Sequence, residues 1–485
     1  MKKHVTSIFF VLSIFSFCIL GCGKKEESSI VPEVIVEDLS ENPIIEGIEP
    51  EDEIVKEVIE EAVEKPKETE VLENAEISYP YWWELFDYNA NYEVLASDGE
   101  FKNLTVQPGN HPDELYITWF SKSSSKGKVV FELEAGEKFD CISAKATTQA
   151  SISAPGYYRN SALIQGLESN QTYYYTIKNG NSQSPVYKYK TKDLTSTDFT
   201  FTIAGDPEIG LGDEEVLAGH RSVWRVVLNR MKAQIPDSSF LITMGDQVAK
   251  PSSSVQYDYF LDNSVLYSTP LVPVVGNHDV GTGFFGDHFS LPNQSDAGVM
   301  DGGDGNYWFT KGNVLFMVLN NLSPASRDTH ETFVGDAIAQ NPNAKWRIII
   351  SHYSPISMVE RYQGAAESVR ASYAYMAEIY DIDIFFGGHD HIYTRSYFID
   401  QNRETISTEL EYEFHNPSYP VYVIFNSSTT ALLREPDQDY PWAAICVQNG
   451  VPQLTEVHVT ANSIQVVTHD TDSWKIVDDF TIYKD

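Results

Sequence analysis

Residues 199–208 read FTFTIAGDPE, and residues 239–247 read SFLITMGDQ. In both stretches an apolar run of strand length ends directly in a Gly-Asp pair. The two stretches carry no charged residue before the Gly-Asp pair, and together with the helical spacing of apolar residues at 222–233 they predict strands buried on both faces that are joined by a crossover helix. We therefore expect an α/β sheet whose polar residues gather at the carboxyl ends of its strands.

The same arrangement recurs three times later in the chain. Apolar runs that end near residues 275, 350 and 386 lead directly into polar clusters. These clusters are Gly276-Asn277-His278-Asp279, Ser351-His352 and Gly387-Gly388-His389-Asp390-His391. Carboxylate and amide oxygens suit hard cations, imidazole suits iron, zinc or manganese, and glycine lets the backbone turn sharply beside them. We expect all five clusters to meet at one edge of the sheet.

The order of these clusters (Asp, Gly-Asp, Gly-Asn-His-Asp, His, Gly-His-x-His) is similar to that of the calcineurin-like metallophosphoesterases. Residues 388–395, GHDHIYTR, resemble the purple acid phosphatase branch in particular. The resemblance extends over about residues 99–485. It implies a four-layer α/β/β/α domain with a binuclear metal centre. The implied activity is hydrolysis of phosphate monoesters, of the acid phosphatase kind, by a metal-activated hydroxide.

Carried over position by position, the resemblance gives the clusters their ligand roles. One metal ion would be held by Asp206, the bridging Asp246 and His391. The other would be held by Asp246, Asn277, His352 and His389. A carboxylate shared in this way can bridge two ions about 3.5–4 Å apart, as in-line displacement at phosphorus requires.

The resemblance also suggests residues that act on the substrate. His278 would be the proton donor or transition-state stabiliser, and Asp279 would orient it. Tyr393 and Arg395 follow the last ligands and are candidates for substrate contact, although a packing role is an equally open interpretation for both. His288 lies in the Gly-rich loop that follows Asp279, and it is a third candidate.

The chain departs from the family pattern at two positions. Purple acid phosphatases have a tyrosine three residues after the second aspartate, where this chain has Ala249, so the phenolate that gives the purple colour is missing. Other members have a histidine two residues after the first aspartate, where this chain has Glu208. Glu208 is therefore a candidate ligand, either direct or through water. An oxygen ligand shifts the preference toward manganese, magnesium or iron, and zinc also stays open.

A second domain is expected at residues 79–194, ahead of the phosphoesterase region at 195–485. It shows short alternating strands separated by turn residues, which is typical of a β-sandwich. Leu167 before a turn and Tyr173 at the start of a strand resemble the corner of a fibronectin type III module, and Trp119 is expected to fill the core. The predicted fold class is thus a fibronectin III-like sandwich followed by the α/β/β/α domain, with C-terminal strands joining its edge.

The N-terminus resembles a bacterial lipoprotein signal. Two lysines precede an apolar run at 8–20, and Ile19-Leu20-Gly21-Cys22 resembles a lipobox. We predict a signal peptide at 1–21, lipidation of Cys22 and an acidic disordered tether at 22–78, because residues 23–78 hold 19 acidic and 5 basic side chains and no aromatic one. The chain is expected to be exported and anchored to the bacterial cell envelope.

The charge composition of the chain limits the molecules that it can bind. The formal net charge is −36, and an acidic surface repels the nucleic-acid backbone, so no nucleic-acid binding is expected. An anionic substrate, such as a small phosphate ester, must then be attracted by local cations. Cys141 and Cys446 are expected to be small buried hydrophobic residues, with a long-range disulfide left open.

Two other functions remain open from the sequence. The same metal site would serve a phosphodiesterase or nucleotidase, because pocket shape decides between these substrates. A catalytically inactive cell-surface binding module is the third possibility. The intact set of ligand-type residues argues against it, because a decayed site would usually have lost at least one of them.

Overall fold

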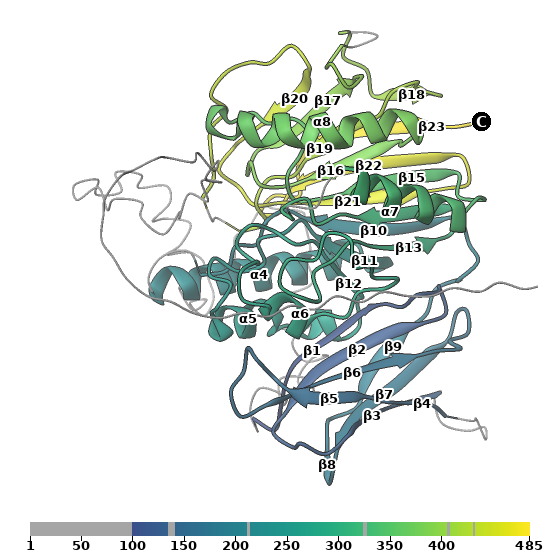
Figure 1. Ribbon diagram of the computed structural model, residues 1–485, viewed down its shortest axis with the longest axis vertical. Helices are drawn as coiled ribbons and strands as arrows, with labels where there is room; N and C mark the ends of the chain where they lie inside the picture. Colours follow the sequence, from purple (N-terminus) through teal and green to yellow (C-terminus); the bar gives the residue numbers. More distant parts are fainter. Residues whose placement is uncertain (1–98, 134–140, 211–213, 324–326, 405–407, 430–431) are drawn as a thin grey trace, which may run out of the picture. The chain divides into compact units, whose positions relative to one another are not determined.

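The computed structural model describes residues 99–133, 141–210, 214–323, 327–404, 408–429 and 432–485 (Figure 1). The predicted signal peptide, Cys22, the tether and residues 79–98 lie outside these ranges. Among the described helices, none combines the length and the apolar composition that crossing a membrane requires.

The first part of the described chain is a β-sandwich. Its strands are β1 (Phe101–Pro108), β2 (Leu115–Ser121), β3 (Gly127–Leu133), β4 (Ile142–Lys145), β5 (Thr147–Ala150), β6 (Tyr158–Ile164), β7 (Thr172–Asn179), β8 (Ser182–Gln183) and β9 (Tyr187–Lys190). One sheet has the order β1-β2-β6-β5 and the other β4-β3-β7-β8, with β9 also pairing β7. Alternating side chains from both sheets form the core between them.

Two aromatic residues behave in the sandwich as the sequence predicts. Trp119 is fully buried, and its Nε1 donates a hydrogen bond to Oδ1 of Asn179 at 2.7 Å. The hydroxyl of Tyr173 accepts a hydrogen bond from the backbone N–H of Glu168 at 2.9 Å. Such a tie from a strand tyrosine to the preceding turn is the tyrosine corner of Greek-key sandwiches.

The second part contains two seven-stranded sheets. The first has the order β12-β11-β10-β21-β22-β23-β18, and the second has the order β13-β14-β15-β16-β19-β17-β20. The strands of the first sheet are β10 (Phe199–Ala204), β11 (Ser238–Thr243), β12 (Leu271–Pro273), β18 (Glu413–His415), β21 (Gln453–Val459), β22 (Ser463–Asp470) and β23 (Ile476–Tyr483). Those of the second are β13 (Tyr307–Lys311), β14 (Val314–Val318), β15 (Trp346–Ile350), β16 (Ile384–Gly387), β17 (Tyr393–Phe398), β19 (Val421–Ile424) and β20 (Ala443–Val447).

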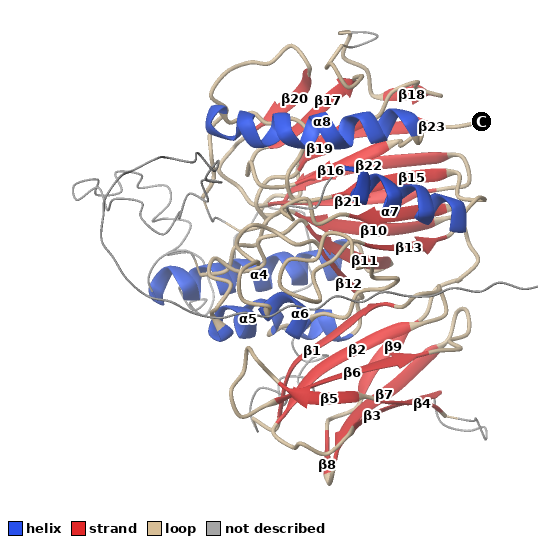
Figure 2. Cartoon of the chain, in the orientation of Figure 1, coloured by secondary structure: helices blue, strands red, loops and turns tan. Residues whose placement is uncertain are grey.

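Helices complete a four-layer arrangement. The helical segments are α4 (Glu214–Gln234), α5 (Ser254–Leu261), η1 (Ser264–Tyr267), α6 (Phe284–His288), α7 (Arg327–Gln340), η2 (Glu360–Tyr362) and α8 (Gln363–Ile379). The two sheets face each other, since the rings of Phe201 and Phe316 meet edge to face at 5.3 Å. Helices α7 and α8 pack on the outer face of the second sheet, as Figure 2 shows, while α4 packs against the first. The predicted α/β/β/α fold class is confirmed.

The C-terminal strands join the first sheet beside its parallel strands. Strand β21 pairs antiparallel with β10, and β22 and β23 follow it, so these strands extend the sheet from the edge formed by β10. The alternating pattern of 453–483 correctly predicts strands, but it carries no information about which strand they join. Cys141 is exposed and Cys446 is half-buried, and both are free thiols, so the expected burial holds for neither fully and the disulfide is absent.

Candidate metal centre

The predicted clusters follow the carboxyl ends of neighbouring parallel strands. Asp206 follows β10 and Asp246 follows β11, which pair in parallel. Glycine is required at these turns for steric reasons. A Cβ on Gly245, whose φ is +99°, would lie 2.4 Å from Nδ1 of His352, and one on Gly276 would lie 2.1 Å from the backbone nitrogen of Asp246. The glycines therefore allow the two turns to touch the histidine and each other.

The side chains of all five clusters converge. Nε2 of His352 lies 3.3 Å from Oδ2 of Asp246 and 3.0 Å from Oδ1 of Asn277. Nε2 of His391 lies 3.2 Å from Oδ2 of Asp206. One ligand atom each from Asp246, His352 and His389 lie within 4.8 Å of one another. Residues separated by up to 185 positions in the sequence thus form a single polar cluster.

Glu208 joins this cluster. Its Oε2 lies 3.8 Å from Nε2 of His391, and its Oε1 lies 3.5 Å from Nε2 of His278. Glu208 and His278 also form, with Asp246, a second group whose ligand atoms lie within 4.8 Å of one another. The carboxylate therefore lies between the predicted ligands and the predicted proton donor.

Several members of the cluster have a left-handed backbone conformation that side chains other than glycine rarely adopt. The φ angles are +39° for Glu208, +47° for Asp246, +72° for His389 and +55° for His391. Backbone strain of this kind persists only where the surrounding structure enforces it, and it concentrates at functional sites.

The donor set fits metal ions. Nδ1 of His352 is hydrogen-bonded to the carbonyl oxygen of Met244 at 2.8 Å, and Nδ1 of His391 to that of Leu432 at 3.0 Å. A carbonyl only accepts, so each Nδ1 carries the proton, and in the neutral ring the lone pair of Nε2 then faces carboxylate oxygens. Oδ1 of Asp206 and Oε2 of Glu208 are also buried without a hydrogen-bond partner. Cations bound at this cluster would satisfy these acceptors.

Without a cation the same groups must retain protons. Burial lowers the pKa of His352, but the carboxylates of Asp246 and Asp206 outweigh it and raise the pKa to about 10. Burial likewise lowers the pKa of His391, and Asp206 with Glu208 raises it to about 9. Burial raises the pKa of the Glu208 carboxyl to about 7. Metal binding at this centre must therefore displace protons.

Asp279 does not orient His278, contrary to the expectation from the sequence. Its buried carboxylate accepts hydrogen bonds from the backbone N–H groups of Gln247 at 3.0 Å and Gly276 at 2.9 Å. The imidazole of His278 is held instead through Nδ1, which donates to the carbonyl oxygen of Ala249 at 2.9 Å. Asp279 therefore fixes the backbone of two ligand-bearing turns, which is a positioning role.

The expectation that Tyr393 and Arg395 contact the substrate is wrong, and the packing interpretation holds. Both side chains are buried and hydrogen-bonded to Asp478 on β23. The guanidinium of Arg395 binds the two carboxylate oxygens of Asp478 at 2.7 and 3.2 Å. The pair links strand β17 of the second sheet to strand β23 of the first.

The expectation for His288 is also wrong. Its ring is buried and stacks on Tyr257 with a centroid distance of 4.1 Å. The ring also lies 4.9 Å from that of Phe120 on β2, so it packs at the contact with the sandwich. Burial lowers the pKa of His288 to about 4, so the ring is neutral and acts as a packing element.

One polar run that supports the centre was missed. After β19 comes the sequence Asn426-Ser427-Ser428-Thr429, which follows a buried strand just as the other clusters do. The hydroxyl of Ser427 donates to the carbonyl oxygen of Asp206 at 2.8 Å, and that of Ser428 donates to the carbonyl oxygen of Gly205 at 2.6 Å. The position of this run after an apolar strand was the signal that would have identified it.

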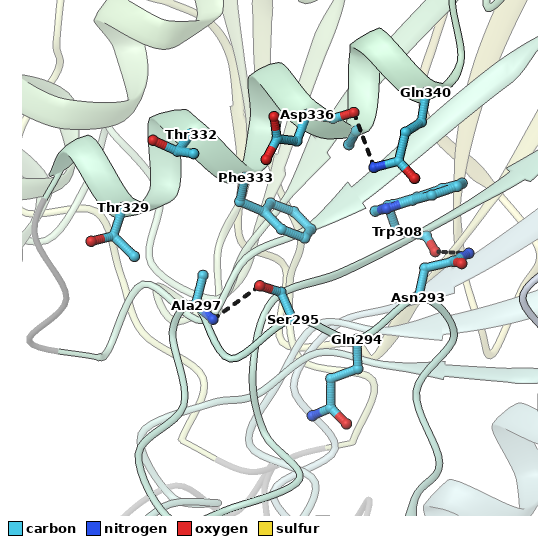
Figure 3. A pocket seen from close by; sticks show the side chains of 11 residues that line it. Asn293, Gln294, Ser295, Ala297, Trp308, Thr329, Thr332, Phe333, Asp336 and Gln340 are labelled. Atoms are coloured by element: carbon cyan, nitrogen blue, oxygen red, sulfur yellow. Dashed lines mark hydrogen bonds between the residues drawn. The ribbon is translucent and has the colours of Figure 1, made fainter. Parts of the chain in front are cut away.

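A surface cavity of about 610 Å³ lies elsewhere, between α7, β13 and the loop at 293–297. Figure 3 shows the rings of Trp308 and Phe333 beside the amide side chains of Asn293 and Gln340. None of the residues lining it belongs to the polar cluster. The candidate site is thus defined by its donor atoms and not by the volume of a cavity.

Two family descriptions match the chain. Residues 101–191 match the N-terminal domain of purple acid phosphatases, and residues 199–393 match the calcineurin-like phosphoesterases. A phosphoenolpyruvate phosphatase from Allium cepa is 22% identical over 319 residues, which cover 61% of this chain and 63% of that protein.

Two further relatives extend the likeness. An Fe(3+)-Zn(2+) purple acid phosphatase from Arabidopsis thaliana is 21% identical over 382 residues, covering 72% of this chain and 77% of that protein. The solved structure of the purple acid phosphatase PPD1 from yellow lupin (Lupinus luteus) superposes with a TM-score of 0.64 at 15% identity. That alignment covers 79% of this chain and 74% of the lupin chain.

Proposed function

The chain combines a purple acid phosphatase N-terminal domain with a calcineurin-like phosphoesterase domain, and on that premise we propose that it hydrolyses phosphate esters with the help of two metal ions. The observation that carries this proposal is the pair of imidazoles of His352 and His391. Backbone carbonyls fix Nδ1 of both rings, so that the Nε2 atoms face carboxylate oxygens at 3.3 Å for His352 and 3.2 Å for His391.

We assign the candidate ligands to two ions. Asp206, His391 and Glu208 would hold one ion, and Asn277, His352 and His389 would hold the other. Asp246 would be shared, because its carboxylate groups with His352 and His389 on one side and with Glu208 on the other. Two ions bound there would neutralise phosphate charge and acidify water, so that hydroxide forms near neutral pH. The added oxygen of Glu208 and the absence of a tyrosine ligand favour manganese, magnesium or iron over zinc.

His278 is placed to supply the proton that the leaving alcohol needs. Its Nδ1 is held by the carbonyl of Ala249, and 35% of its side chain is exposed. Nε2 is the ring atom that points to the cluster, 3.5 Å from Oε1 of Glu208. When the P–O bond to the alcohol breaks, a proton on Nε2 passes to the departing oxygen, and the imidazole becomes neutral.

The experiment is a hydrolysis assay on the purified protein with manganese or iron added, using p-nitrophenyl phosphate and bis(p-nitrophenyl) phosphate. We expect faster turnover of the monoester, a bound metal content near two per chain, and loss of both in Asp246→Ala with the fold retained by circular dichroism. A faster diesterase rate would favour the phosphodiesterase function instead. Absence of turnover of either ester with metal bound would contradict the proposal and favour a binding module.

We also propose that the chain is an exported lipoprotein of the bacterial cell envelope, anchored through Cys22. The support is the sequence of the first 22 residues, which reads as a basic start, an apolar run and Ile19-Leu20-Gly21-Cys22. Mass spectrometry of the protein from membranes should find a lipid-modified Cys22 at the mature N-terminus. An unmodified or uncleaved N-terminus would contradict the assignment.

A further inference from the structure

Two arginines lie beside the candidate metal centre. The guanidinium carbons of Arg361 and Arg434 lie 4.7 and 5.2 Å from the centre of the Tyr362 ring. That ring in turn lies 4.0 Å from the ring of His389. Both cations are therefore one side chain away from a proposed metal ligand, and they are no more than about 10 Å from each other.

The segments that carry these arginines are tied to the turn between His389 and His391. Asp390, at the centre of that turn, accepts a hydrogen bond from the backbone N–H of Met358 at 2.7 Å, shortly before Arg361. On the other side, the carbonyl oxygen of Leu432, two residues before Arg434, holds Nδ1 of His391 at 3.0 Å. The positions of the arginines are therefore coupled to those of the ligands.

The two arginine segments are also fastened to each other. The backbone N–H of Asp437 donates to the carbonyl oxygen of Met358 at 3.1 Å, and the N–H of Glu360 donates to the Asp437 carboxylate at 2.5 Å. The Asp437 carboxylate thus accepts a hydrogen bond from the backbone of the segment that carries Arg361. These hydrogen bonds hold together the backbone segments that carry Arg361 and Arg434.

Neither arginine has a carboxylate partner among the described residues. No ion pair involves Arg361 or Arg434 there, in contrast to the buried pair of Arg395 with Asp478. Nε of Arg434 is moreover buried without a hydrogen-bond acceptor. Two uncompensated cations are notable in a chain with a formal net charge of −36, where an anionic substrate has to be attracted locally.

We propose that Arg361 and Arg434 form an anion subsite, and that the preferred substrates are phosphate esters whose alcohol part carries a second oxyanion, a carboxylate or a second phosphate. This inference rests on the proposed function of the adjacent metal centre. The planar guanidinium is suited to such groups because it donates two parallel hydrogen bonds to a carboxylate or phosphate. Near the metal ions, the subsite would bind the part of the substrate that is not hydrolysed.

The test compares two substrates that share a carbon skeleton. The carboxylate of 3-phosphoglycerate is replaced by a hydroxymethyl group in glycerol 3-phosphate, so released phosphate reports on the second anion alone. We expect the wild-type protein to favour 3-phosphoglycerate in kcat/KM by roughly tenfold or more, as one charge-assisted contact provides. Fructose 1,6-bisphosphate against fructose 6-phosphate makes the same comparison for a second phosphate.

Arg361→Met and Arg434→Met keep the apolar stem and remove the charge. Each should reduce kcat/KM for the doubly anionic substrates about tenfold, mainly through KM, and change it less than about twofold for glycerol 3-phosphate. Arg361→Lys and Arg434→Lys should restore part of the loss. Arg327→Met is the control for the loss of a cation–ring contact, because Arg327 on α7 lies 4.0 Å from the ring of Tyr375 and pairs with Glu331 at 3.7 Å, on a helix that carries none of the proposed ligands.

The outcomes separate the two proposals. Equal rates for both members of each substrate pair, or a preference that survives in both methionine variants, overturns the anion subsite while the phosphatase function stands. If no substrate is hydrolysed, the proposed function fails. Calorimetric titration with 3-phosphoglycerate and glycerol 3-phosphate then still decides on the subsite, because binding that does not distinguish the two compounds overturns it.

Discussion

Nδ1 of His278 donates a hydrogen bond to the carbonyl oxygen of Ala249 at 2.9 Å, which fixes the ring so that Nε2 faces the metal-ligand cluster. His278→Asn should therefore remove the proton donor and leave the donor atoms of the metal ligands in place. We expect kcat to fall by about 100-fold or more, as removal of a general acid does, with the bound metal unchanged. Phosphate release and metal analysis on the same sample check this. A variant with near wild-type kcat would exclude His278 as the proton donor.

Ala249 leads to a prediction about the colour of the iron-loaded protein. It occupies the position where purple acid phosphatases have their tyrosine ligand, and its methyl group cannot coordinate iron. The iron-loaded protein should therefore show no tyrosinate charge-transfer band in its visible absorption spectrum. A purple preparation would mean that another tyrosine has taken over the ligand position.

The carboxylate of Asp279 accepts two backbone N–H groups, from Gln247 and Gly276. In Asp279→Asn the new amide accepts through one atom only, so one buried donor loses its partner, at a cost of about 1–3 kcal/mol in the free energy of unfolding. Metal affinity should fall by roughly 10–100-fold, because both turns carry ligands. Chemical denaturation and metal titration measure the two effects. Loss of kcat with full affinity and stability would instead point to a direct catalytic role.

A substitution of Arg395 tests whether Tyr393 and Arg395, which follow the last predicted ligands, have a structural role. Because its pair with Asp478 is buried, Arg395→Met leaves a buried carboxylate without its partner, and the free energy of unfolding should fall by about 3–5 kcal/mol. The folded fraction of Arg395→Met should have the same KM for phosphate monoesters as the wild type. Asp478→Asn, which disturbs the same pair from the other sheet, should also be destabilising. A raised KM with normal stability would restore the substrate role.

Glu456 gives the fold a pH dependence that is separate from the metal centre. Burial alone would raise its pKa, but hydrogen bonds from His458 and His469 lower it to about 2. The folded pKa is therefore below the ordinary value of 4.5, so the stabilisation is fully present above about pH 4.5 and is lost as the pH falls toward 2.

Glu456→Gln should accordingly destabilise the protein at pH 5.5 by about 1 kcal/mol, given the partial exposure of the pair to solvent. The difference from the wild type should shrink steadily as the pH is lowered through 4.5. Urea unfolding at a series of pH values measures it. A difference that stays constant down to pH 2.5 would show that the hydrogen bonds do not depend on the charge of Glu456.

The sequence is most informative where a short apolar run meets a polar cluster. The runs at 199–204 and 346–350 correspond to β10 and β15 residue for residue, and the clusters that follow them converge as predicted. This works because the carboxyl ends of parallel strands share one edge of a sheet, so order along the chain translates directly into proximity.

The features that were mispredicted depend on pairing between distant segments. Arg395 follows closely on His391 in the sequence, yet it lies on a strand whose side chains alternate, and it faces Asp478 on the other sheet. His288 is buried by contact with the sandwich. The sequence makes no prediction for Arg434, because its location beside Tyr362 is set by a loop contact for which the sequence carries no periodic signal.

The pairing of β10 with β21 has a consequence for biosynthesis. Strand β10, which precedes Asp206, has β21 as its antiparallel neighbour across residues 199–204 and 454–459. The ribosome therefore releases the segment with the predicted ligand Asp206 some 250 residues before the strand that pairs with β10. Until residues 454–459 have been synthesised, the edge of β10 beside Asp206 lacks its antiparallel neighbour, so this sheet can be completed only late in translation.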